Sequence, residues 1–163
     1  MSKITPTLWF DGQVEEAAAF YVSLLPDSRI EQINRSPIDT PSGPAGMVLT
    51  AILTLAGQRF CLLNGGPMFP QTEAVSFMIE TKDQAETDRL YDAIVANGGA
   101  ESACGWCKDR WGVSWQVTPR RLLELTTDPD QARAQRAMAA MMTMRKIDIA
   151  AIEAAAAGDT VAA

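Results

Sequence analysis

The chain has 163 residues, 47% of them hydrophobic, which is enough for one domain or two small fused modules with a buried core. With 14 Lys and Arg against 20 Asp and Glu, the net charge is −6 and no basic run appears, which argues against nucleic acid as a partner. No apolar stretch is as long as a membrane span, and the start MSKITPTLWFDG lacks the apolar core of a signal peptide, so we expect a cytoplasmic protein without a membrane partner.

The first half predicts a strand, a helix and three further strands. Residues 4–10 are apolar and extended, and Asp11-Gly12 turns the chain into an amphipathic helix over residues 13–25. Asp at such a position accepts hydrogen bonds from first-turn N–H groups, so we expect Asp11 to cap this helix rather than to contact a ligand. The strands are expected over residues 28–36, 47–55 and 59–63.

The same element order begins again in the second half. A strand over residues 75–80, a turn and an amphipathic helix over residues 85–95 repeat the start of the chain. A short strand over residues 100–103, a Cys-rich segment and a strand over residues 113–118 complete the set. Sequence identity between the halves is weak, so the predicted repeat depends on element order and on matched turn chemistry.

From Pro119 onward the hydrophobic period is helical. Asp128-Pro129-Asp130 predicts a helix N-terminus with Pro at the first helical position, and the helix is expected to end near Arg145. A second, Ala-rich helical segment follows over residues 147–157. Methionines recur at helical spacing and are expected to fill a core, with a partner surface as the alternative. These methionines are Met138, Met141, Met142 and Met144.

The segment CGWC at residues 104–107 has the spacing of a dithiol oxidoreductase site. Reactivity would require a helix that starts at the first Cys and stabilises its thiolate, but the following residues KDRWGVSWQV read as a turn and a strand. In extended chain the i and i+3 side chains point to opposite faces, which keeps the sulfurs apart. With Cys61 the cysteine count is odd, so we expect reduced, structural cysteines, and a solvated or interfacial Asp109–Arg110 pair in the turn.

Histidine is absent from the sequence. Its absence removes the Ser-His and Cys-His nucleophile arrangements, the usual general base near neutral pH, and the commonest ligand of zinc, nickel and iron. The pairs Gly65-Gly66 and Gly98-Gly99 fit neither a phosphate loop nor a dinucleotide fingerprint. Any chemistry would therefore come from carboxylates, Lys, Tyr, Cys or backbone dipoles, and no cofactor is expected.

Several segments are characteristic in combination: ITPTLWFDGQVEEAAAFYVSLLPDSRI, NGGP with Phe69 and TEAVSF, CGWCKDRWGVSWQVTP, and DPDQARAQRAMAAMMTMRKIDIAAIEAA. Over roughly residues 3–157 they resemble the PhnB-like branch of the vicinal oxygen chelate superfamily, which includes glyoxalase, bleomycin resistance and dioxygenase proteins. Many members of the branch carry the description 3-demethylubiquinone-9 3-methyltransferase. The resemblance implies an α+β fold of two βαβββ modules, whose mixed sheets curl around a small-molecule cavity in a homodimer. We therefore expect modules at residues 1–66 and 67–120 and a C-terminal helical extension at residues 121–163.

The chain departs from the superfamily where metal-dependent members hold an ion. The resemblance places Gln116 at the position of the final Glu ligand, and no His stands at the strand beginnings, residues 5–6 and 74–75. Met68 follows the NGGP segment, where relatives often have His. A neutral amide leaves a divalent ion uncompensated, so no bound catalytic metal is expected. No Gly-rich turn follows the first strand to hold S-adenosylmethionine.

The candidate ligand-binding residues are aromatic, apolar or polar side chains near the expected cavity. Gln116 is interpreted as an amide that orients a ligand, with a hydrogen-bonded core amide as an equal alternative. Glu73 is the carboxylate to test for acid–base chemistry, since burial in a cavity would raise its pKa. Tryptophan packs cores and dimer seams more often than it stacks on ligands. The full predicted set is Trp9, Met68, Glu73, Phe77, Trp106, Trp115 and Gln116.

Two functions from different classes follow from this reasoning. The first is a metal-free protein that binds a small, partly apolar molecule. The alternative is an enzyme, either a metal-dependent isomerase or dioxygenase with an atypical ligand set, or the 3-demethylubiquinone-9 3-methyltransferase of the family description.

Overall fold

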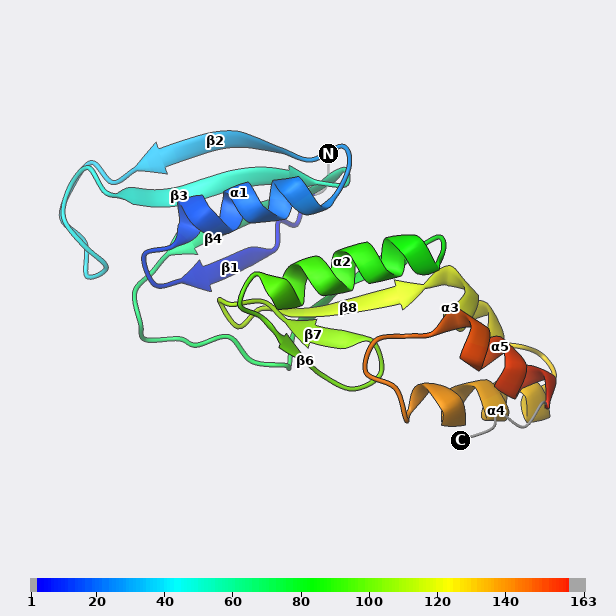
Figure 1. Cartoon of the computed structure of the whole chain (residues 1–163). Helices are drawn as coiled ribbons and strands as arrows, with labels where there is room; N and C mark the ends of the chain where they lie inside the picture. Colours follow the sequence, from blue (N-terminus) through cyan, green and yellow to red (C-terminus); the bar gives the residue numbers. More distant parts are fainter. Residues whose placement is uncertain (1–2, 159–163) are drawn as a thin grey trace. The chain divides into compact units, whose positions relative to one another are not determined.

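The computed structural model describes residues 3–158 of the chain, drawn in colour in Figure 1. The chain divides into two compact units, residues 1–71 and 72–163. Each unit contains one mixed four-stranded sheet, and the second also carries the C-terminal helices. The predicted α+β class, the two βαβββ modules and the C-terminal helices are therefore confirmed. No helix in the described part of the chain has both the length and the hydrophobicity that a membrane span requires.

The first unit follows the predicted order: β1 (Thr7–Phe10), α1 (Val14–Leu24), β2 (Arg29–Arg35), β3 (Val48–Leu55) and β4 (Gln58–Asn64). Its sheet order is β1-β4-β3-β2, with β1 parallel to β4 and the other neighbours antiparallel. Alternate residues of β3, Ala51, Leu53 and Leu55, are buried, because α1 packs against this strand. The intervening residues of β3 are only half-buried and define an open face of the sheet.

The second unit repeats this arrangement with β5 (Ser76–Thr81), α2 (Gln84–Ala96), β6 (Ala100–Glu101), β7 (Trp106–Lys108) and β8 (Ser114–Pro119). The sheet order is β5-β8-β7-β6, and β5 runs parallel to β8 as β1 does to β4. The internal repeat predicted from element order is thus confirmed at the level of topology. The Cys-rich segment, for which no strand was predicted, contains β7.

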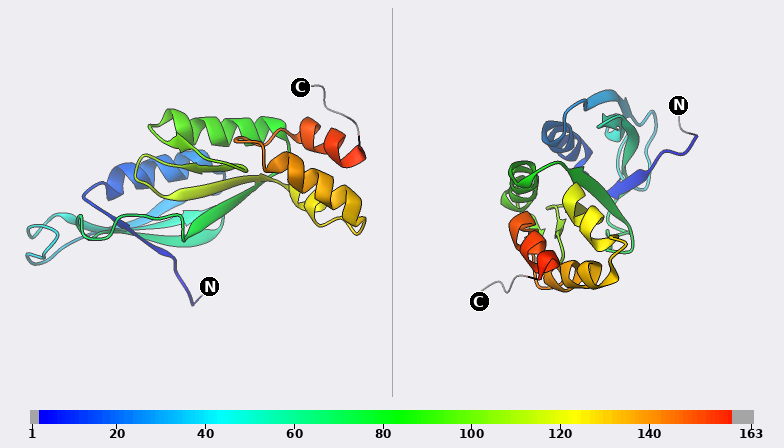
Figure 2. Two further views of the ribbon diagram at one scale, coloured as in Figure 1. Left: turned by 90° about the horizontal axis from the view of Figure 1, so that it is seen from below. Right: turned by 90° about the vertical axis from the view of Figure 1, so that its right-hand side faces the viewer.

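Three helices complete the chain: α3 (Arg120–Thr126), α4 (Gln131–Met141) and α5 (Ile149–Ala157). They pack together in both views of Figure 2 and bury a cluster of their own. Met141 and Met144 pack against this cluster, whereas Met138 and Met142 are exposed, so the methionines divide between core and surface. The cluster consists of Leu122, Leu125, Ala137, Ile147, Ile152 and Ala156.

Two details of the predicted helices were wrong. The N-cap of α4 is Asp130, whose carboxylate accepts hydrogen bonds from the N–H groups of Ala132 and Arg133, so Pro129 precedes the cap instead of opening the helix. The helix ends at Met141 rather than near Arg145. The residues after Met141 leave the helix because their carbonyl groups bind another segment, described below.

Candidate functional site

The open face of the second sheet carries Gln116. Directly paired residues of neighbouring strands share a face, so the pairing of β8 with β5 and β7 assigns the members of this face. The Nε2 of Gln116 donates a hydrogen bond to the Oγ of Ser76 over 2.8 Å, and Met78 is 54% exposed. The face therefore lies open beside the amide. Its members around the amide include Ser76, Met78, Trp106, Lys108, Ser114 and Gln116.

Phe77 and Trp115 lie on the opposite face of the same sheet. They are paired in register, and their ring centroids are 5.7 Å apart. Trp115 is only 3% exposed, and its indole Nε1 donates to Asp109 Oδ2 over 2.9 Å. The structure thus brings Trp106 and Gln116 together, but it places Phe77 and Trp115 in the packing around α2 and away from them.

Asp109 organises the turn between β7 and β8. The side chain is buried, and Oδ1 accepts hydrogen bonds from the N–H groups of Trp111 and Val113, each over 3.0 Å. The prediction of a solvated Asp109 was therefore wrong, because the turn needs an acceptor for these inward N–H groups. The Arg110 guanidinium lies over the Trp111 ring, 4.5 Å from its centroid.

A pocket of about 240 Å³ opens at the edge of this face, where β6, β7 and β8 meet. Lys108 forms an ion pair with Glu73, whose side chain is 64% exposed. The hydrogen bond from Lys108 holds the pKa of Glu73 below its usual value, so the expectation that burial would raise this pKa was wrong. The Oγ of Ser114 is buried and has no hydrogen-bond partner among the described residues. The pocket is lined by Glu73, Ala100, Glu101, Ser102, Trp106, Cys107, Lys108 and Ser114.

Trp9 and Met68 belong to the first unit. The indole Nε1 of Trp9 donates to the carbonyl of Gly66 over 2.7 Å, and its ring meets Phe69 edge-on at 5.0 Å. A Cβ on Gly65 would lie 2.2 Å from the Trp9 ring, so only glycine fits there. The NGGP segment therefore encloses Trp9, while Met68 is 74% exposed.

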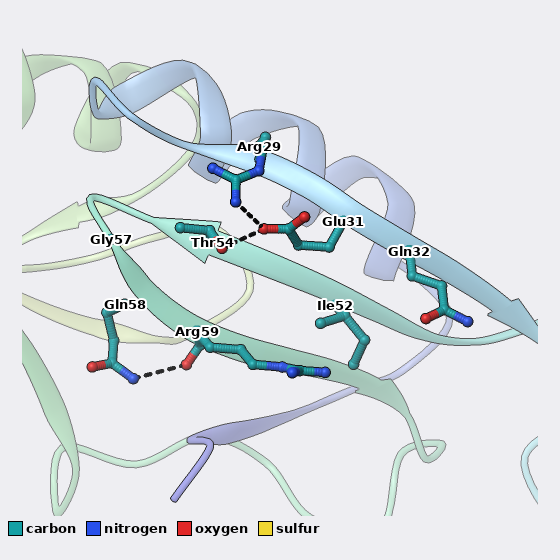
Figure 3. Close-up of a pocket in the computed structure, with 8 residues that line it drawn as sticks. All are labelled: Arg29, Glu31, Gln32, Ile52, Thr54, Gly57, Gln58 and Arg59. Atoms are coloured by element: carbon teal, nitrogen blue, oxygen red, sulfur yellow. Dashed lines mark hydrogen bonds and ion pairs between the residues drawn. The ribbon is translucent and has the colours of Figure 1, made fainter. Parts of the chain in front are cut away.

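A second pocket, of about 430 Å³, lies on the open face of the first sheet and is shown in Figure 3. Glu31 accepts hydrogen bonds from Thr54 and Arg29, each over 2.6 Å, and the hydrogen bond from Thr54, together with that from Arg29, lowers its pKa. None of the lining residues was predicted, although the polar residues that alternate with buried ones in β3 mark this face. The lining is Arg29, Glu31, Gln32, Ile52, Thr54, Gly57, Gln58 and Arg59.

The donor groups do not fit a catalytic transition metal. Within residues 3–158, no three or more side chains of His, Cys, Asp or Glu are grouped so that they could hold an ion. Gln116, which the family resemblance places at a ligand position of metal-dependent members, uses its amide to donate a hydrogen bond to Ser76. A neutral amide beside a hydroxyl leaves the charge of a divalent ion uncompensated.

The CGWC segment has a structural role. Burial, reinforced by the charge of Asp109, raises the pKa of Cys107 to about 12, so its nucleophilic thiolate is disfavoured. Cys104 and Gly105 have positive φ values of 60° and 81°. In this conformation their N–H groups donate to the carbonyls of Met144 and Arg145 over 2.8 and 2.6 Å. The segment therefore attaches the chain between α4 and α5 to the second module.

The chain thus consists of two βαβββ modules with the same strand order, the architecture that the resemblance to the vicinal oxygen chelate superfamily implies. The sequence profile of the 3-demethylubiquinone-9 3-methyltransferase family matches residues 2–118, and the chain belongs to this family. The match ends before α3, so the C-terminal helices lie outside it, and the resemblance is shorter than the predicted span of residues 3–157.

Two solved structures illustrate the relationship. The PhnB protein from Bacillus cereus is 35% identical, with a TM-score of 0.65, over 72% of this chain and 99% of that protein. The protein PA1353 from Pseudomonas aeruginosa is 24% identical, with a TM-score of 0.55, over 73% of this chain and 98% of that protein, and supports the fold alone. No protein of curated function matches the chain.

Proposed function

We propose that the protein binds a small, partly apolar molecule on the open faces of its sheets and does so without a catalytic metal. The observation that carries this proposal is the Gln116 amide, which donates a hydrogen bond to Ser76. The family resemblance places a carboxylate ligand of metal-dependent members at this position. A cytoplasmic homodimer, expected from the resemblance and the composition, belongs to the same proposal.

The chemistry of the open face of the second sheet supports ligand binding. Small-molecule sites combine apolar and aromatic walls with a few polar groups that orient the ligand. Here Trp106 and Met78 supply apolar surface, while Gln116 and Lys108 supply polar groups on the same face. These side chains surround no reactive nucleophile, since the nearby Cys107 thiol stays protonated near neutral pH.

The second candidate is methyl transfer, which the family description favours. This activity would require the chain to bind S-adenosylmethionine. The turn after β1 is Asp11-Gly12, which is not the Gly-rich loop that commonly holds such a cofactor.

Metal content separates the proposal from metal-assisted chemistry. Protein purified without chelator is expected to contain far less than one equivalent of Ni, Zn, Mn or Fe by elemental analysis, and EDTA is expected to leave its melting temperature unchanged. A stoichiometric metal whose removal lowers the melting temperature would contradict the proposal.

A thermal-shift screen tests ligand binding and methyl transfer together. The panel contains S-adenosylmethionine, quinones, thiol conjugates and aromatic antibiotics. A ligand at about 100 times its Kd adds about 2.7 kcal/mol to the stability of the folded state. We expect an aromatic member to raise the melting temperature, and Gln116→Met to reduce this rise, while Gln13→Met on the exposed start of α1 leaves it unchanged. A rise with S-adenosylmethionine alone would favour the methyltransferase.

A further inference from the structure

Ser114 presents an unused hydroxyl to the pocket at the edge of the second sheet. The residue is 1% exposed, and its Oγ has no partner among the described residues. Leaving a buried polar group without a hydrogen bond is unfavourable, and such groups in native proteins call for a partner such as a water or a ligand. Ser114 therefore lines the pocket with the donor capacity of its hydroxyl unused.

Lys108 lies beside this hydroxyl, because Lys108 and Ser114 are directly paired on β7 and β8. Its present partner, Glu73, lies in the segment before β5, and the two side chains are 36% and 64% exposed. Exposed ion pairs contribute only about 0–1 kcal/mol, so another anion can displace Glu73 into water at little cost. Lys108 is held by its strand and cannot leave in the same way.

The remaining charge in the pocket does not oppose an anion. Glu101 also lines the pocket, but the Arg145 guanidinium neutralises it over 3.1 Å. Trp106, paired in register with Gln116, adds an aromatic wall. Once Glu73 is displaced, the pocket therefore presents one cation, one hydroxyl donor and one indole.

We infer that this pocket binds the oxyanion end of the ligand, a carboxylate or phosphate attached to an aromatic or apolar group. Lys108 Nζ and Ser114 Oγ donate to the oxyanion, and the attached group lies against Trp106. This inference rests on the proposed function and specifies its ligand class. The pocket volume of about 240 Å³ is below the ~300–1,000 Å³ of sites that enclose drug-sized ligands, so it holds the head of the ligand only.

The inference can be tested on the full chain by NMR titration with benzoate, phenyl phosphate, benzamide and benzylammonium. The readouts are the Trp106 indole signal and the backbone amides of Lys108 and Ser114. We expect benzoate or phenyl phosphate to bind about tenfold more tightly than benzamide, as a charge-assisted hydrogen bond implies. The relative affinities of the two anions identify carboxylate or phosphate as the natural group.

Three variants give effects of different sign. Lys108→Gln is expected to weaken benzoate binding about tenfold, while Lys82→Gln, with the same change in net charge, leaves it unchanged. Glu73→Gln removes the competing carboxylate and is expected to tighten binding several-fold, whereas Glu15→Gln on α1 has no effect. Ser114→Ala is expected to weaken binding without lowering the melting temperature, because it removes an unsatisfied group.

Weaker benzoate binding in Glu73→Gln, or benzamide or benzylammonium binding as tightly as benzoate, would overturn the oxyanion inference while leaving small-molecule binding intact. The inference also fails if no probe shifts the Trp106, Lys108 and Ser114 signals. In that case a positive thermal-shift screen keeps the proposed function, and a negative screen removes it as well.

Discussion

Asn64 illustrates how a single residue holds the first unit together. It is buried, its Oδ1 accepts from the N–H of Val14 over 3.3 Å, and its Nδ2 donates to the carbonyl of Val48 over 2.8 Å. The side chain thus caps α1 and ties it to β3 and β4. Asp11, the predicted cap, does not fill this role, because the helix begins at Val14 with no capping side chain of its own segment.

Replacing Asn64 with Ala is expected to lower the free energy of unfolding by about 2–3 kcal/mol, because two buried backbone groups lose their partners. Asp11→Ala is the matched control and is expected to change it by less than about 0.5 kcal/mol. Urea unfolding followed by circular dichroism measures both. If both variants lower the free energy of unfolding by the same amount, Asp11 caps α1 as the sequence predicted.

At the scale of elements, the sequence predicts most helices and strands but not the shortest pieces. The strand β7 has three residues, Trp106–Lys108, and follows two residues of positive φ, so no alternating pattern is long enough to indicate it. Alternation did assign the faces of β8 correctly, with Gln116 on one side and Trp115 on the other. The cap on α1 could not be read locally, because Asn64 lies 50 residues from Val14.

The candidate site was predictable only in part, for a related reason. Gln116 was predicted from strand alternation and the family resemblance, and Trp106 was predicted as an aromatic candidate. Both lie on the open face. The roles of Lys108 and Ser114 depend on cross-strand register, which a sequence window does not contain. The ion pair between Glu73 and Lys108 also joins segments separated by α2, so the lowered pKa of Glu73 could not be anticipated.

Gly105 connects the second module to the C-terminal helices, and its replacement tests this connection. A Cβ at Gly105 would lie 2.9 Å from Cγ1 of Ile147 and 3.0 Å from the carbonyl oxygen of Val117, and φ is 81°. Gly105→Ala is expected to lower the free energy of unfolding by about 3 kcal/mol. Backbone strain accounts for about 1–2 kcal/mol of this loss, and overpacking against Ile147 and Val117 for a similar amount.

The control is Gly57→Ala, where φ is 83° and no atom lies within 4 Å of an added Cβ. This variant has the backbone strain alone. It is expected to lower the free energy of unfolding by about 1–2 kcal/mol, measured for both variants by urea unfolding followed by circular dichroism. If Gly105→Ala lowers the free energy of unfolding no more than Gly57→Ala does, Ile147 does not pack tightly against the turn.

At the scale of the whole molecule, the family match and the packing divide the chain at the same place. The matched region ends at residue 118, and β8 ends at Pro119. All members of the C-terminal hydrophobic cluster come after this point, so the extension carries its own core. Polar contacts join it to α2, including the hydrogen bonds of Gln84 with Ile147 and Ile149 over 3.0 and 2.8 Å.

A chain that ends at Arg120 is therefore expected to remain folded, with a lower melting temperature and reduced helical circular dichroism. The strands keep their partners because each sheet is complete before α3. Heteronuclear NMR of the shortened protein checks this expectation. Collapse of the amide dispersion would show instead that the extension is required for folding.

The alternation of buried and half-buried residues along β3 has a consequence for how such proteins diversify. In β3 the buried positions contribute to the core, while the positions between them are only half-buried. Substitutions at the solvent-facing positions can change ligand selectivity with little effect on the free energy of unfolding. Members of a family with this fold can therefore differ in activity while they keep the same fold. A family description then indicates common ancestry more reliably than a shared activity.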